Sequence, residues 1–104
     1  MIREFIITLI MEIFFKSPFR KFVKKQTRPF QLVIEDEVER IAHDPEIGTT
    51  KKGDLTGFRI HKFTFNKQQV LIAYRVIEAD ILFYMTGSHE NFYRDLKKYI
   101  REVE

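Results

Sequence analysis

The sequence contains no cysteine and no tryptophan, and only four glycines and three prolines among its 104 residues. Without cysteine, the chain cannot form a disulfide, bind a metal through thiolates or use a thiol nucleophile, which favours a reducing compartment. Disorder is also disfavoured, because eleven phenylalanines and 44% hydrophobic residues supply the apolar area that disordered chains lack. We therefore expect one small globular domain over residues 1–104.

Neither sign of charge is in large excess, since 18 Lys and Arg stand against 15 Asp and Glu. The net charge of +3 is too small by itself to indicate a nucleic-acid-binding protein, but the charges are segregated along the chain. Residues 16–28 carry six basic and no acidic side chains, residues 35–46 are mainly acidic, and residues 51–67 are basic apart from Asp54. The folded protein is expected to present separate positive and negative faces.

The most apolar run, residues 5–15, is too short to cross a membrane as a helix. It is also a poor signal peptide, because acidic residues stand before and within it and no small-residue cleavage site follows. Its β-branched and aromatic content predicts a strand, at least from Met11 to Phe15. Met11 is itself an alternative translation start, and on that hypothesis residues 1–10 are a dispensable extension.

The pattern downstream predicts two helices, three strands and a final helix. Ser17 and Pro18 form a helix-start signal, and Pro29 restarts a helix that ends near His43. After a glycine-rich loop, the apolar period changes from 3.6 to 2. The predicted strands cover residues 58–66, 70–77 and 81–86, and an amphipathic helix follows from Phe92 to Val103.

This β-α-α-β-β-β-α order predicts an α+β domain, with a small antiparallel sheet and helices packed on one face. The other face of the sheet is expected to be open and available to a ligand. The middle strand is apolar on both sides except at Tyr74 and Arg75, which predicts a central position.

The side chains that could perform chemistry are cations and histidines. No histidine has the spacing of a zinc site and no phosphate-binding loop is present, so neither a metal nor a cofactor is predicted. The remaining candidates are Lys51, Lys52, Arg59, His61, Lys62, Arg75, His89 and Arg94. Such a set suits cleavage of RNA by its own 2′-hydroxyl, where histidine acts as base or acid and cations stabilise charge on phosphorus. Composition alone does not select this reaction.

Four features carry a resemblance to a known family. They are the element order, residues 52–59 (KGDLTGFR), the strand LIAYR at 71–75, and the strand end TGSH at 86–89 with Phe92 and Tyr93 beyond it. Over about residues 11–104, this combination resembles the RelE/ParE toxin superfamily of bacterial type II toxin-antitoxin systems. The resemblance implies a cytoplasmic toxin that an antitoxin neutralises and that inhibits translation by cleaving mRNA on the ribosome. ParE branches instead poison DNA gyrase without being nucleases.

The branch with the most similar motifs is the YafQ-type nucleases. The resemblance places the C-terminal catalytic histidine of that branch at His89. Its first active-site histidine falls on Thr49, and its second has an approximate counterpart in His61, one residue out of register. The central-strand arginine of RelE- and YoeB-type toxins falls on Leu71. The Gly-x-x-x-Gly-aromatic-Arg framework falls on Gly53, Gly57, Phe58 and Arg59.

We therefore predict a metal-independent endoribonuclease in which His89 is the general acid or base. The predicted catalytic residues are His89, Arg59 and His61, and the predicted substrate-binding residues are Lys51, Lys52, Arg75 and Tyr93. The structural alternatives are a hydrogen-bonding His89, arginines paired with carboxylates across the sheet, and a Tyr93 packed in the core. The functional alternatives are a gyrase inhibitor and a toxin-fold interaction module without activity.

Overall fold

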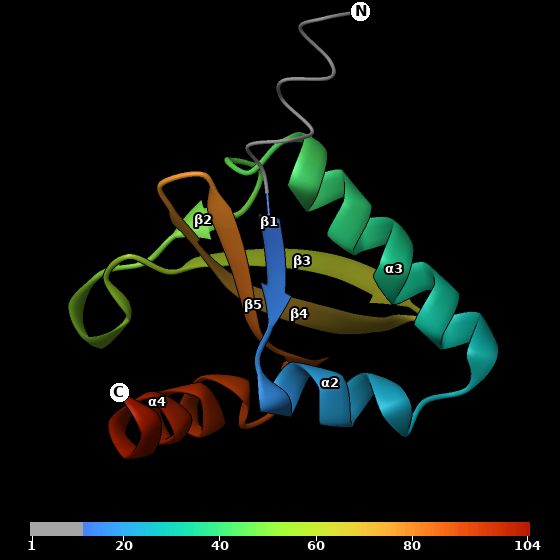
Figure 1. Cartoon of the computed structure of the whole chain (residues 1–104). Helices are drawn as coiled ribbons and strands as arrows, with labels where there is room; N and C mark the ends of the chain where they lie inside the picture. The colour runs from blue at the N-terminus through green and yellow to red at the C-terminus, as the bar shows by residue number, and fades with distance from the viewer. Residues whose placement is uncertain (1–11) are drawn as a thin grey trace, which may run out of the picture.

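The computed structural model describes residues 12–104 (Figure 1). The predicted extension at residues 1–10 and the alternative start at Met11 lie outside the described residues. The elements are β1 (Glu12–Phe15), α2 (Ser17–Lys24), α3 (Arg28–His43), β2 (Thr49–Thr50), a 3₁₀ turn η1 (Gly53–Leu55), β3 (Arg59–Phe65), β4 (Gln68–Ile77), β5 (Asp80–Ser88) and α4 (Phe92–Val103). The predicted α+β class and the order of the elements are confirmed, with the two-residue β2 added inside the predicted loop.

The strands form one sheet in the order β1-β5-β4-β3-β2. The predicted meander is confirmed, because β3, β4 and β5 pair antiparallel. Asn66 and Lys67 both have positive φ angles, of 51° and 64°, as expected for a tight hairpin between β3 and β4. The prediction of a wholly antiparallel sheet was wrong, because β1 pairs parallel to β5. The long connection through the helices and the meander permits this parallel pairing.

The sheet has an apolar core on each side. On one side, Ile72 and Tyr74 of β4 pack with residues of α2 and α3. On the other side, the alternate residues Leu71 and Ala73 pack with Phe92 and Leu96 of α4. The predicted packing of the helices on a single face, with the opposite face open, was therefore wrong. A central strand that is apolar on both sides needs a cover on both, and the amphipathic α4 supplies the second.

The two N-terminal helices begin at the predicted positions, because Pro18 and Pro29 both lie in a first turn. Figure 1 shows that α2 and α3 follow β1 as a helical pair, whereas α4 ends the chain beside the sheet. Within residues 12–104, none of the helices has the length and the apolarity that a membrane crossing requires.

Candidate functional site

Three of the predicted site residues meet beside the N-terminus of α4, and we call His89, Tyr93 and Lys51 the His89 cluster. His89 follows β5, and its ring stands edge-on to the Tyr93 ring, with centroids 6.0 Å apart and an angle of 80° between the planes. Lys51, from the loop after β2, places Nζ 5.0 Å from the centroid of the Tyr93 ring. An imidazole, a phenol and an ammonium therefore share one surface. His89 and the neighbouring Lys52 are exposed, and Lys51 and Tyr93 are half-buried.

The loop that carries Lys51 is fixed to the sheet by Tyr74 and Arg59. The buried Tyr74 hydroxyl accepts a hydrogen bond from the Gly48 amide at 2.9 Å and donates one to the Pro45 carbonyl at 2.7 Å. Arg59 Nη1 donates to the Gly48 carbonyl at 2.8 Å and to the Glu46 carbonyl at 3.1 Å. Lys51 follows within three residues of Gly48, so these bonds restrict where its ammonium can lie.

The structure does not bring Arg59 and His61 together with His89. Both point from β3 toward the side of the sheet that α3 covers, opposite to α4. His61 is only 8% exposed, and its Nε2 lies 2.6 Å from Glu37 Oε1 of α3. Glu37 Oε1 also lies 3.4 Å from Arg40 Nε. The His61 ring is thus held beneath a helix, on the far side of the sheet from the His89 cluster.

Arg75 lies on the α4 side but toward the other end of β4. Ser88 pairs with Val70, whereas Arg75 pairs with Leu82. At about 3.3 Å per residue, five residues of strand separate the two places by roughly 16 Å. Arg75 Nη1 donates weakly to the Tyr84 hydroxyl at 3.4 Å and lies 3.5 Å from Glu104 Oε1. Its guanidinium also stacks over the Phe58 ring, 5.2 Å from the centroid.

Two buried tyrosines have raised pKa values. Burial raises the pKa of Tyr74 above its ordinary value of 10.0, more than the Gly48 hydrogen bond and the Arg59 charge lower it. Burial also raises the pKa of Tyr84, and its hydrogen bond to the Glu104 carboxylate raises it further. Both hydroxyls therefore stay protonated and keep donating at neutral pH. No group of three or more metal-ligating side chains is found within residues 12–104.

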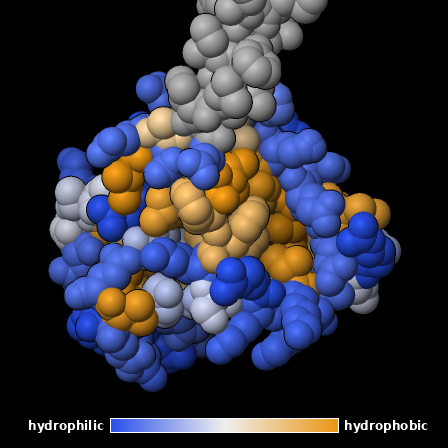
Figure 2. All heavy atoms as spheres, viewed as in Figure 1, coloured by the Kyte–Doolittle hydropathy of each residue, from blue (hydrophilic) through white to orange (hydrophobic). Residues whose placement is uncertain are grey.

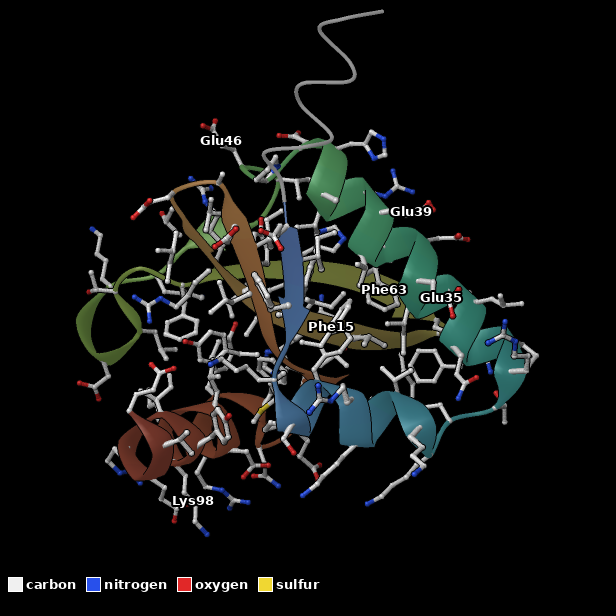
Figure 3. The ribbon with its side chains drawn as sticks, viewed as in Figure 1. Phe15, Glu35, Glu39, Glu46, Phe63 and Lys98 are labelled. Carbon is white, nitrogen blue, oxygen red and sulfur yellow. The ribbon has the colours of Figure 1, made fainter. Side chains whose placement is uncertain are left out.

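An apolar groove opens on a different surface, between β1, α2 and α3. Its volume is about 550 Å³, and its floor is formed by Phe15, Phe19, Val23, Ile34 and Val38. Arg20 and Lys24 border it on α2, and Glu35 and Glu39 border it on α3. Figure 2 shows hydrophobic atoms in the middle of this face with hydrophilic atoms around them, and Figure 3 labels Phe15 near the middle and Glu35 and Glu39 along α3.

Sequence reasoning missed Tyr84, Glu37 and Glu104 as contact partners of its candidates. Only the contact of Tyr84 with Arg75 could have been predicted from the sequence. The two residues lie on neighbouring predicted strands, and the short turn between these strands brings them close together. Glu37 is 24 positions from His61, and Glu104 is 29 positions from Arg75. No local pattern links residues at such separations.

The fold and the family comparison together define the class of protein. A family model for the ParE-like toxins of type II bacterial toxin-antitoxin systems matches residues 13–97, which is most of the chain. The chain therefore belongs to this family, and it is a toxin of the RelE/ParE kind. The resemblance to the RelE/ParE superfamily is thereby confirmed. No curated protein sequence matches the chain significantly.

Solved structures of an Escherichia coli toxin share the fold. A mutant of E. coli RelE in the free state is 12% identical with a TM-score of 0.69, over 90% of this chain and 98% of that chain. A chain of the intact E. coli RelBE toxin-antitoxin complex is 15% identical with a TM-score of 0.62, over 77% of this chain and 98% of that chain. The isolated E. coli RelE toxin is 15% identical with a TM-score of 0.60, over 86% and 98%. At these identities, the likeness is one of fold.

Proposed function

We propose that this toxin is a metal-independent endoribonuclease that cleaves mRNA on the ribosome at the His89 cluster. The observation that carries the proposal is the meeting of an exposed imidazole with a phenol and an ammonium at the N-terminus of α4. An imidazole can act as an acid or a base in proton transfer, and an ammonium can stabilise negative charge on a phosphate.

The proposed reaction is attack of a 2′-hydroxyl on the adjacent phosphorus. A base removes the hydroxyl proton, the new O–P bond forms, the bond to the 5′-oxygen breaks, and an acid protonates that oxygen. The products are a 2′,3′-cyclic phosphate and a free 5′-hydroxyl. His89 serves as base or acid, while Lys51 and the neighbouring Lys52 stabilise the charge on the phosphate oxygens. Tyr93 stacks on a base or takes part in proton transfer.

Arg59 and His61 receive positioning roles in this proposal. The Arg59 guanidinium is bound to two carbonyls of the loop that precedes Lys51, so Arg59 acts on the site through the position of Lys51. His61 joins β3 to α3 through Glu37. The predicted direct catalytic roles of both residues would require them to reach the opposite side of the sheet.

The proposed partner of the groove is the helix of a cognate antitoxin. One of the similar structures is a toxin-antitoxin complex, which supports an antitoxin partner for this chain as well. The groove has an apolar floor, a basic border on α2 and an acidic border on α3. An amphipathic helix with acidic residues on one flank and basic residues on the other would complement it.

The test is a brief induction of the toxin in bacterial cells, followed by primer extension on cellular mRNA. We expect cuts within codons, and we expect His89→Ala to reduce cutting by roughly 100-fold or more, the usual size of a general acid–base contribution. The control is His43→Ala, which removes another exposed histidine, on α3. Uncut mRNA with the unaltered toxin, or full cutting by a folded His89→Ala variant, would refute the proposal.

Inhibition of DNA gyrase is the second candidate, because the matching family model is that of the ParE-like toxins. Loss of supercoiling activity and induction of DNA damage while mRNA stays intact would select it. Non-toxic overexpression in the absence of antitoxin would instead select an interaction module without activity.

A further inference from the structure

A second group of polar side chains lies on the α4 side of the sheet around Arg75, toward the other end of β4 from His89. We call Arg75, Tyr84 and Lys16 the Arg75 site. The Tyr84 hydroxyl donates a hydrogen bond to Glu104 Oε2, and Arg75 Nη1 lies 3.5 Å from the other oxygen, Oε1. Lys16 Nζ lies 5.3 Å from the centroid of the Tyr84 ring. The Glu104 carboxylate is thus held by a guanidinium and a phenol, and an ammonium lies over the face of the phenol ring.

Arg75 and Lys16 have hydrogen-bond donors that are not satisfied by the described residues. Arg75 has five N–H donors, but among the described residues it makes only two hydrogen bonds, both through Nη1, at 3.4 and 3.5 Å, near the long limit of a hydrogen bond. Lys16 forms no ion pair with any acidic residue of the described chain. Gly57 leaves space beside the arginine, since a Cβ built there would lie 3.8 Å from Arg75 Nε. The site therefore has spare donors and spare positive charge.

The side chain that fills the Arg75 site is that of Glu104, and its contacts are with Arg75 and Tyr84. The first half of α4 is anchored by the buried Phe92 and Leu96, whereas every residue from 101 to 104 is exposed. Carboxylates at a helix C-terminus also oppose the helix dipole, and both Glu102 and Glu104 lie there. The contacts with Arg75 and Tyr84 are the main tie on the Glu104 side chain, so the last turn can leave the sheet without disturbing the core.

We propose that the Arg75 site binds a phosphate group and that Glu104 is a tethered competitor, which fills the site until a phosphate displaces it. A phosphate oxygen can take the place of each Glu104 oxygen, and the Lys16 ammonium over the Tyr84 ring adds positive charge that favours a phosphate, which carries more negative charge than a carboxylate. The neutral Tyr84 hydroxyl suits this role, because it donates to an anion of either kind.

The source of the phosphate is the backbone of single-stranded RNA, and this assignment alone rests on the proposed function. Both the Arg75 site and the His89 cluster lie on the α4 side, and the Val70–Ser88 pair beside His89 is roughly 16 Å along β4 from Arg75. An RNA strand cleaved at one can therefore place a phosphate a few nucleotides away at the other. Arg75 then contributes to binding and not to the cleavage step.

The site itself is tested by titrating the full chain with inorganic phosphate, followed by ¹H–¹⁵N NMR of the Arg75 side chain and the Gly57 amide. We expect Glu104→Gln to bind phosphate at least about fivefold more tightly than the unaltered protein, since the competing charge is gone. The control is Glu102→Gln, which removes an exposed charge two positions before Glu104. We expect it to leave the affinity for phosphate unchanged. Equal affinity in all three proteins, or shifts spread over the surface lysines, would overturn the proposal.

The RNA source is tested with a hexauridylate that lacks 2′-hydroxyls and cannot be cleaved. We expect it to shift the Arg75 side-chain signal, to bind more tightly to Glu104→Gln, and to bind more weakly to Arg75→Gln. Phosphate binding at Arg75 without any effect of the oligonucleotide would remove the RNA assignment. These readouts measure binding alone, so they are independent of whether His89→Ala abolishes cleavage.

Discussion

Replacement of Tyr74 by phenylalanine removes a single oxygen atom from the centre of the fold. Tyr74 is 0% exposed, and its hydroxyl bonds both the Gly48 amide and the Pro45 carbonyl. In Tyr74→Phe, the Gly48 amide would be buried without a partner, at a cost of about 1–3 kcal/mol. The Pro45 carbonyl is partly accessible and can bond water, so its loss is smaller, about 0.5–1 kcal/mol. The total is roughly 1.5–4 kcal/mol of a stability that is typically about 5–15 kcal/mol.

Thermal unfolding followed by circular dichroism measures this effect. A loss of roughly 1.5–4 kcal/mol should lower the Tm by about 6–30 °C in a domain of this size. The matched control is Tyr99→Phe, since the Tyr99 hydroxyl has no hydrogen bond to any described residue. We expect its Tm to stay within about 2 °C of the unaltered protein. If Tyr74→Phe were no less stable than Tyr99→Phe, the Tyr74 hydroxyl would not be the anchor of the loop that carries Lys51.

Three other perturbations have definite expected outcomes. Gly48→Ala should lower the Tm as well, because its Cβ would lie 2.7 Å from Tyr74 Oη and 2.9 Å from Cε1; a Tm equal to that of Thr50→Ala would contradict this geometry. Stability should fall as pH rises through and beyond 10.0, where unfolded tyrosine ionises but Tyr74 and Tyr84, with raised folded-state pKa values, keep their protons. Urea unfolding from about pH 9 to about pH 11 measures this loss, which should be smaller in Tyr74→Phe. In the groove, Val23→Asp should weaken antitoxin binding by roughly tenfold or more in calorimetry, while Lys21→Asp on the exposed side of α2 should not; equal losses would remove the groove as the docking surface.

Local sequence patterns predicted the elements of this fold better than their arrangement. The third predicted strand, 81–86, lies within β5, and the helix from Phe92 to Val103 agrees with α4. These elements follow from periodicity and from turns a few residues long. The parallel pairing of β1 with β5 and the side of the sheet that α4 covers depend on contacts between distant segments. The apolar character of both sides of β4 was visible in the sequence, and it already required a second cover.

The candidate site shows the same division. Tyr93 lies four residues beyond His89 in the chain, so their contact is a local one, and both residues were among those predicted for the site. The approach of Lys51 to Tyr93 depends on how the loop after β2 is anchored, which involves Tyr74 and Arg59 from two strands. The facing of His61 could not be read from the alternation of its strand, and its partner Glu37 lies on a distant helix.

The pairing of β1 with β5 also has a consequence for synthesis of the toxin. Glu12 is paired with Asp80, so the first described strand has no neighbour in the sheet until the last strand has been translated. The local hairpins of β3, β4 and β5 can form without this contact, whereas β1 must close a very long loop. Phe15 of β1 lines the apolar groove, so the groove is complete only after this late step. A nascent chain therefore lacks the finished groove until β5 has been translated and β1 has paired with it.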